Sequence, residues 1–96
     1  MREIKFRAWN GEEMYYFDLG EVSVDWYKHK LMQYTGLKDK NGAEIYEGDL
    51  IKFEGLAVLE VKFIYEEDEG RFGWNFGRTD CEVIGNIYEN PELVKE

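Results

Sequence analysis

Cysteine, proline and histidine are nearly absent from this chain of 96 residues, which contains one of each. The lone Cys81 excludes an intrachain disulfide and a Cys-rich zinc site, and it suits a reducing compartment. The single histidine, His29, lies between Lys28 and Lys30, whose positive charges disfavour its protonation. We therefore interpret His29 as a surface loop residue rather than a general base.

Basic residues are also scarce. The chain has 12 Lys and Arg against 21 Asp and Glu, which gives a formal net charge of -9. Proteins that bind nucleic acid cluster Lys and Arg against the phosphates, so nucleic acid is not expected as a partner, and neither is an anionic membrane surface. Two interpretations of the acidity stay open: it attracts a basic protein surface, or it only keeps the protein in solution.

Long apolar runs are missing, and nothing after Met1 resembles a secretory signal. We therefore expect no membrane-spanning segment and a protein that stays in the cytoplasm where it is made.

Motifs for catalysis and cofactor binding are missing as well. The sequence has no Ser-His-Asp set, no His-Cys pair and no glycine-rich phosphate loop. The acidic run from Glu66 to Glu69 lacks the ligand spacing of an EF-hand, so we predict no metal site there. Asp80 precedes Cys81 and should raise its thiol pKa. We predict no enzyme and no cofactor. The alternative is a small hydrolase or nucleotide-binding protein that gathers carboxylates such as Glu47 and Asp49 in space.

What the sequence does contain is a series of short β patterns. Apolar or aromatic residues alternate with polar ones, and no helical stripe of i, i+3, i+4 and i+7 is present. We predict strands over residues 5–9, 14–17, 22–26, 31–37, 45–46, 50–53, 57–65, 71–76 and 81–88. The strand over 57–65 is expected to be the longest, with one wholly apolar face formed by Leu59, Val61, Phe63 and Tyr65.

Turn chemistry is densest between Leu31 and Phe53. Residues 39–42, Asp-Lys-Asn-Gly, predict a hairpin loop because Asp bonds its own backbone and Gly accepts a positive φ. Gly48 and Asp49 predict a second sharp turn before the next strand. Asn90 and Pro91 predict a short helical turn, with Asn90 as the cap and proline at the first position.

These elements predict an all-β, mainly antiparallel fold in a single domain over residues 1–96. We expect residues 31–88 to form a small, partly open SH3-like barrel and residues 1–30 to add strands to it. Aromatic residues make up 17% of the chain, and we expect Phe72, Trp74 and Phe76 in the core.

Three separated motifs resemble the YopX family of bacteriophage and prophage proteins. They are KFRAWN at 5–10, the run from Leu31 to Phe53, and EVIGNIYENPEL at 82–93. The resemblance implies a phage- or prophage-encoded, β-rich protein without an assigned molecular activity, made in a bacterial host. The matching positions are interpreted as structural; they are Trp9, Tyr34, Thr35, Gly36, Leu37, Asp39, Asn41, Gly42, Ile45, Tyr46, Gly48, Asp49, Ile84, Gly85, Asn86 and Tyr88.

Together these features favour a non-enzymatic domain that binds protein, with itself, a phage protein or a host protein as partner. Candidate contact residues are Glu66, Glu67, Glu69 and Tyr46; Tyr15 and Tyr27 are further candidates for exposed aromatics. Homo-oligomer formation is expected if sheet edges are exposed.

Two alternatives stay open. The first is an acidic mimic of DNA that inhibits a host DNA-binding protein, which requires carboxylates gathered on one face. The second is an SH3-like module that binds nucleic acid through a basic stripe such as Arg71, Arg78 and Lys52.

Overall fold

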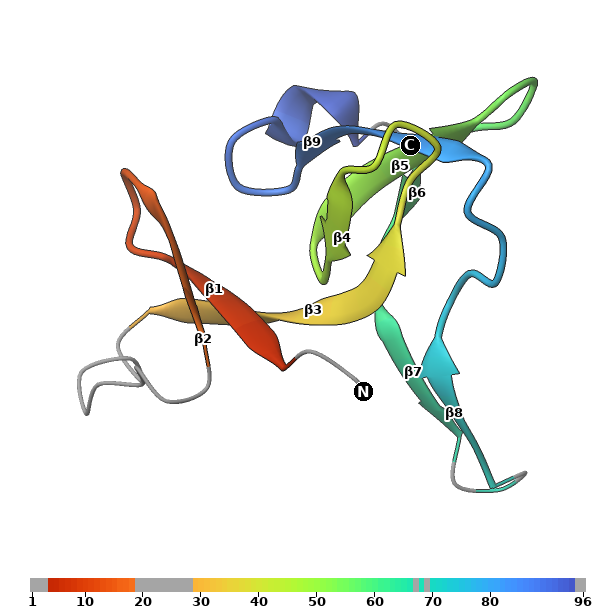
Figure 1. The fold of residues 1–96 in the computed structure, drawn as a ribbon, viewed down its shortest axis with the longest axis horizontal. Coiled ribbons are helices and arrows are strands. Elements are labelled where there is room, and N and C mark those ends of the chain that lie inside the picture. Colours follow the sequence, from red (N-terminus) through yellow and green to blue (C-terminus); the bar gives the residue numbers. More distant parts are fainter. Residues whose placement is uncertain (1–3, 19–28, 67, 69, 95–96) are drawn as a thin grey trace.

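The computed structural model describes residues 4–18, 29–66, 68 and 70–94, and this part of the chain is almost entirely antiparallel β-structure (Figure 1). The elements are β1 (Lys5–Trp9), β2 (Met14–Asp18), β3 (Lys30–Lys38), β4 (Glu44–Tyr46), β5 (Asp49–Phe53), β6 (Leu59–Glu60), β7 (Phe63–Glu66), β8 (Arg71–Trp74), β9 (Cys81–Asn86) and the 3-10 turn η3 (Pro91–Leu93). The strands form three sheets, in the orders β2-β1-β3-β4, β6-β5-β9 and β7-β8.

The first sheet begins with the predicted β1–β2 hairpin. Asn10 Oδ1 accepts hydrogen bonds from the backbone N–H groups of Glu12 and Glu13, both at 2.8 Å. Gly11 follows at φ +105°, in the left-handed region that glycine adopts readily. The other edge of β1 pairs with β3, so the N-terminal strands are part of the same sheet as the central hairpin.

The β3–β4 ladder contains an irregularity that the turn chemistry does not reveal. Its register shifts between the Tyr34–Tyr46 and Lys38–Glu44 pairs, and Gly36 lies inside this bulge at φ +88°. The buried Thr35 hydroxyl donates to the carbonyl of Ile45 at 2.8 Å and accepts from the N–H of Leu37. These bonds replace the interrupted ladder and direct Leu37 toward the core.

Gly48 carries the chain from the first sheet to the second. It adopts φ +89°, and a Cβ there would lie 3.0 Å from Met32 Sδ. Its N–H donates to the Val61 carbonyl, and its own carbonyl accepts from the Ile87 N–H. A residue with a side chain would therefore be strained and crowded at this turn.

The hydrophobic core lies around β5 and β9. Its buried members are Ile45, Ile51, Phe53, Val61 and Cys81. Cys81 is fully buried, as expected for a small apolar strand residue. The predicted core aromatics Trp74 and Phe76 lie partly buried against this cluster, whereas the side chain of Phe72 is outside the described part of the structure.

The predicted single strand over residues 57–65 is wrong. It is divided into β6 and β7, which belong to different sheets. The backbone changes partners at the break: the Val61 N–H donates to the Asp49 carbonyl, while the next N–H, of Lys62, donates to Asn75 Oδ1. Asn75 Nδ2 also donates to the Glu60 carbonyl, so this one side chain bridges the break and ends β8 before residue 76.

Asn90 occupies the N-cap position of the C-terminal turn, as expected, but its side chain does not do the capping. Its side chain makes no capping hydrogen bond to η3, although Pro91 does occupy the start of the turn. Instead, Asn90 Oδ1 accepts from the backbone N–H of Asn86 at 3.2 Å.

The predicted all-β, antiparallel and partly open architecture with a C-terminal helical turn is confirmed, and the described sheets do not close into a barrel. The SH3-like character and the division at residue 31 stay predictions. The predicted strand over 22–26 lies outside the described residues.

Candidate functional site

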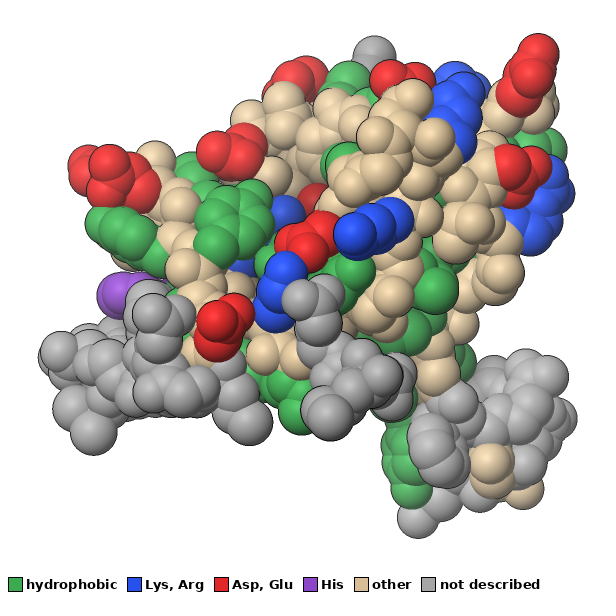
Figure 2. Space-filling model, viewed as in Figure 1, with side chains coloured by type: hydrophobic (Ala, Val, Ile, Leu, Met, Phe, Trp, Pro, Cys, Tyr) green, Lys and Arg blue, Asp and Glu red, His purple; other side chains and the backbone are tan. Residues whose placement is uncertain are grey.

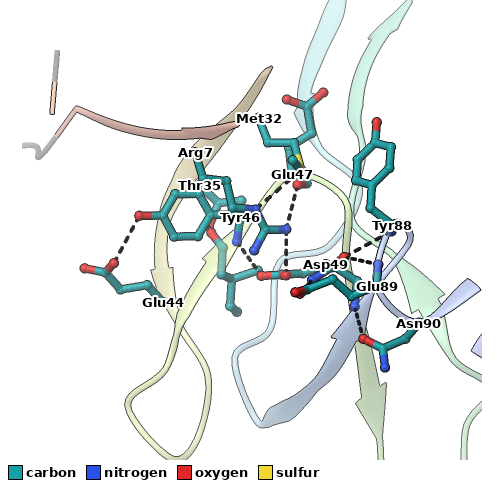
Figure 3. Close-up of polar contacts among 12 residues, drawn as sticks. Arg7, Met32, Thr35, Glu44, Tyr46, Glu47, Asp49, Tyr88, Glu89 and Asn90 are labelled. Carbon is teal, nitrogen blue, oxygen red and sulfur yellow. Dashed lines mark hydrogen bonds and ion pairs between the residues drawn. The ribbon is translucent and has the colours of Figure 1, made fainter. Parts of the chain in front are cut away.

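A buried ion pair joins the first sheet to the second. Arg7 Nη2 of β1 lies 2.8 Å from Asp49 Oδ1 at the start of β5, and both side chains are 3% exposed. The same guanidinium donates to the Glu47 carbonyl at 3.2 Å and contacts Met32 Sδ at 3.4 Å (Figure 3). A buried charge without a partner would carry a large desolvation penalty. In this pair the charge of each residue offsets the penalty of burying the other.

Asp49 is also bonded through its second oxygen, which accepts from the Tyr46 N–H at 2.7 Å. Burial raises the pKa of the Asp49 carboxyl, while the charge of Arg7 acts in the opposite direction. Both carboxylate oxygens are thereby occupied within the chain.

Tyr46 was expected to be an exposed anchor, and this prediction is wrong: its side chain is buried, with only 3% of the residue exposed. The Arg7 guanidinium carbon lies 4.9 Å from its ring centroid, and the rings of Tyr16 and Tyr34 each lie 5.4 Å away. Its hydroxyl donates to Glu44 at 3.3 Å. Burial, followed by the charge of Glu44, raises the pKa of the Tyr46 phenol well above its ordinary range.

A pocket of about 340 Å³ opens beside this ion pair, between the first sheet and the segment from β9 to Asn90. Its lining is mostly polar and aromatic, and both members of the ion pair belong to it. The lining side chains that matter below are Arg7, Asp49, Tyr16, Tyr46, Glu44 and Glu89. Lys5 Nζ approaches the pocket from outside and lies 2.6 Å from Glu44 Oε2.

Asp39 organises the central hairpin loop. Its Oδ1 accepts from the N–H groups of Asn41 and Ala43, and its Oδ2 accepts from the Val83 N–H of β9. Burial alone would raise the pKa of this carboxyl, but the backbone hydrogen bonds outweigh it and lower the pKa. The loop closes with Gly42 at φ +89°. Because Asp39 bonds both the loop and β9, its side chain ties this hairpin to the second sheet.

The C-terminal motif makes a comparable set of internal contacts. Asn86 Oδ1 accepts from the N–H groups of Tyr88 and Glu89, and a Cβ on Gly85 would lie 2.5 Å from Asn90 Oδ1. Tyr88 also stacks on Trp9 of β1, with ring centroids 6.1 Å apart.

The other residues shared with the family signature are in the sheets. Ile45 is fully buried in the core and Tyr34 is 5% exposed beneath Tyr46. Ile84 is half-buried in β9, and Asn41 is exposed in the loop. The structure therefore places every signature residue in a strand, a turn or a loop near one. Four of them line the pocket: Tyr46, Asp49, Gly85 and Asn86.

The acidic contact residues are only partly covered by the structure. Glu66 ends β7 and its backbone pairs with Arg71. Its side chain, and the whole of Glu67 and Glu69, lie outside the described residues. In the sequence Glu67 and Glu69 fall between β7 and β8.

The β7–β8 hairpin presents an exposed aromatic face. Phe63 is 49% exposed and Tyr65 is 66% exposed, and both belong to the face that the alternation predicts to be wholly apolar. The hairpin extends away from the other two sheets (Figure 1), and the Phe63 ring meets Trp74 edge to face at its base, with centroids 5.1 Å apart. Alternation identifies a common face but does not reveal how much of it stays exposed.

Other exposed charges are paired or dispersed. Arg78 of the suggested basic stripe forms a bidentate contact with Asp80, at 3.0 and 2.6 Å, and Lys52 donates to the Leu56 carbonyl. On the face shown in Figure 2, acidic side chains are scattered and stand beside basic ones, which offers no continuous row of carboxylates there. Tyr15 is 39% exposed and Tyr27 lies outside the described residues.

No group of three or more His, Cys, Asp or Glu in the described part of the chain is placed to hold a metal ion. No helix in the same residues is long and apolar enough to cross a membrane.

Two comparisons with known proteins name the same family, and a third gives a solved structure of similar fold. Residues 19–95 match the family model described as YopX protein. The chain is 27% identical, over 127 aligned positions, to the SPbeta prophage-derived uncharacterized protein YopX of Bacillus subtilis (strain 168), covering 94% of this chain and 95% of that protein. It is also similar to the crystal structure of protein EF1440 from Enterococcus faecalis, with a TM-score of 0.59, 28% identity, and coverage of 99% of this chain and 100% of the other.

Proposed function

The chain belongs to the YopX family of prophage proteins, and from this premise we propose that it is a non-enzymatic domain that binds another protein through the aromatic face of the β7–β8 hairpin. The observation that carries the proposal is the exposure of Phe63 and Tyr65, at 49% and 66%. They are two positions apart on one strand, so they share a face of the ribbon.

Aromatic side chains in this setting are suited to recognition. Tyr and Phe are enriched at protein interfaces, where they bury a large area with few rotatable bonds. A two-stranded ribbon buries little apolar surface of its own, so its stability is marginal without further contacts. A partner that covers Phe63 and Tyr65 would therefore bury apolar surface, and the same contact would stabilise the hairpin.

The edges of the same hairpin favour a partner that supplies a strand. Among the described strands, β7 and β8 pair only with each other. Each is thus an edge strand of a two-stranded sheet, and addition of a strand at such an edge is a common mode of peptide recognition. A second copy of the chain, a phage protein or a host protein in the cytoplasm can supply it.

Charge favours a basic partner surface. The net charge of -9 attracts cationic surfaces over a Debye length, and Glu66, Glu67 and Glu69 adjoin the aromatic face in the sequence. The contact would then combine an apolar centre with an acidic rim.

Quantitative affinity capture from a bacterial lysate tests this function with a matched pair of variants. Tyr65→Ser removes the most exposed ring of the hairpin, whereas Leu56→Ser removes an equally apolar residue, 54% exposed, from a different turn. Sedimentation velocity on the same three proteins measures self-association. The proposal expects a defined complex, with another protein or with itself, that Tyr65→Ser reduces at least about tenfold and Leu56→Ser leaves intact. Equal loss in both variants, or no complex of either kind, would overturn it.

A further inference from the structure

We propose that the pocket beside the Arg7–Asp49 pair binds a guanidinium or alkylammonium group. Its volume, about 340 Å³, is at the small end for ligand pockets and suits one long side chain or a small amine. This site is separate from the β7–β8 hairpin, so the inference goes beyond the proposed function and does not depend on it.

The charges that line the pocket leave an excess of acceptors. Arg7 is neutralised by Asp49 at 2.8 Å, and both are too buried to serve a ligand as free charges. Glu44 and Glu89 remain, one on each side of the pocket. Glu44 already accepts from Lys5 Nζ and the Tyr46 hydroxyl, and Glu89 Oε1 accepts from Asn86 Nδ2 at 2.7 Å. Each carboxylate keeps further lone pairs, which can only accept hydrogen bonds. A cation is therefore the ligand that this lining complements, and an anion is repelled.

The aromatic wall favours the same kind of ligand. The ring of Tyr16 is 60% exposed and packs against Tyr46 with centroids 5.4 Å apart and planes at 77°. Tyr46 already holds one guanidinium, that of Arg7, 4.9 Å from its centroid. A second cation can lie against Tyr16, because ring faces attract ammonium and guanidinium groups.

The chain contains an internal competitor for this site. Lys5 Nζ lies 2.6 Å from Glu44 Oε2, and the two side chains are 26% and 29% exposed. Such a partly exposed pair is weak, so an incoming cation can share or replace it. Removing the charge of Lys5 should therefore strengthen ligand binding, whereas removing that of Glu44 should weaken it.

Titrations of the isotope-labelled full chain, followed by two-dimensional NMR, test the site. The probes are N-acetylarginine amide for a guanidinium from a protein, spermidine for a free amine, and N-acetylalanine amide as the neutral control. We expect saturable shifts at the backbone N–H groups of Gly85, Asn86 and Glu89 with a cationic probe only. The preferred probe distinguishes the two sources of the cation.

Three variants make the test specific, and spectra that keep the native dispersion report that they fold. Glu44→Gln combined with Glu89→Gln should weaken binding about fivefold or more, and Lys5→Gln should tighten it about threefold. Lys62→Gln changes the net charge equally but lies outside the pocket lining, and should have less effect than Lys5→Gln. Binding of the neutral probe, absence of saturable shifts, or equal effects of Lys5→Gln and Lys62→Gln would overturn the proposal.

Discussion

Arg7 and Asp49 lie in different sheets and form an ion pair of 2.8 Å with only 3% of either side chain exposed. Asp49→Asn keeps an acceptor for the Tyr46 N–H but leaves the guanidinium without its counter-charge. Loss of one member of a buried pair typically costs roughly 3–5 kcal/mol, and we expect a loss of this size in the free energy of urea unfolding.

The double variant Arg7→Met with Asp49→Asn completes the cycle. It buries no uncompensated charge, so its loss should be clearly smaller than the sum of the two single losses. Additivity within about 0.5 kcal/mol would mean that the two residues do not act as a pair.

The Asp39 carboxylate should make stability depend on pH. Its folded-state pKa is lowered, so its contribution is fully present above the pKa of the unfolded chain and is lost as pH falls through the folded value. Asp39→Asn removes the charge and one acceptor, and should cost roughly 2 kcal/mol at pH 7. The difference from wild type should shrink below about pH 4, which thermal unfolding at several pH values measures. A difference that is constant over this range would contradict the assignment.

Gly85 should resist substitution because of Asn90. A Cβ at Gly85 would lie 2.5 Å from Asn90 Oδ1, whereas one at Gly77 would meet nothing within 4 Å. We expect Gly85→Ala to destabilise by about 1–3 kcal/mol in denaturant unfolding and Gly77→Ala to have little effect. The Asn90→Gly background should reduce the cost of Gly85→Ala; an unchanged cost there would locate the strain elsewhere.

Cys81 should react slowly with thiol reagents in the native protein. Burial, and then the nearby charges of Asp39 and Asp80, raise the pKa of its thiol. Labelling by a coloured disulfide reagent should be at least about a hundredfold slower than in concentrated guanidinium chloride, because it requires opening of the core. Rapid labelling of a protein that keeps its native melting temperature would contradict this.

The turns were predictable because their chemistry is local. Asp39 and Gly42 determine a loop within four positions, and Asn10 with Gly11 does the same for the first hairpin. These residues act on their own backbone, so neighbouring sequence contains the information.

The divided strand and the exposed aromatic face were not predictable in the same way. Alternation places Phe63 and Tyr65 on one face, but whether another sheet covers that face is a tertiary property. The break after Val61 depends on Asn75, a partner that periodicity does not identify.

The candidate pocket depends on contacts between distant segments. In the sequence, Arg7 occupies a polar position of a strand with alternating residues. Its contacts with Asp49 and Tyr46 exist only in the folded protein. Tyr46 is buried because the same distant segments pack around it. The sequence contains one indication of this contact: Arg7 and Asp49 carry opposite charges and lie in two of the family motifs.

Site-specific photo-crosslinking in phage-carrying bacteria tests the central claim most directly. A photo-reactive phenylalanine is placed at position 65, and in a matched protein at position 56, which is also exposed. The account predicts a discrete crosslinked product, with another protein or with a second copy, from position 65 and none from position 56. No product from position 65, or the same products from both, would contradict a protein-binding role for the β7–β8 hairpin.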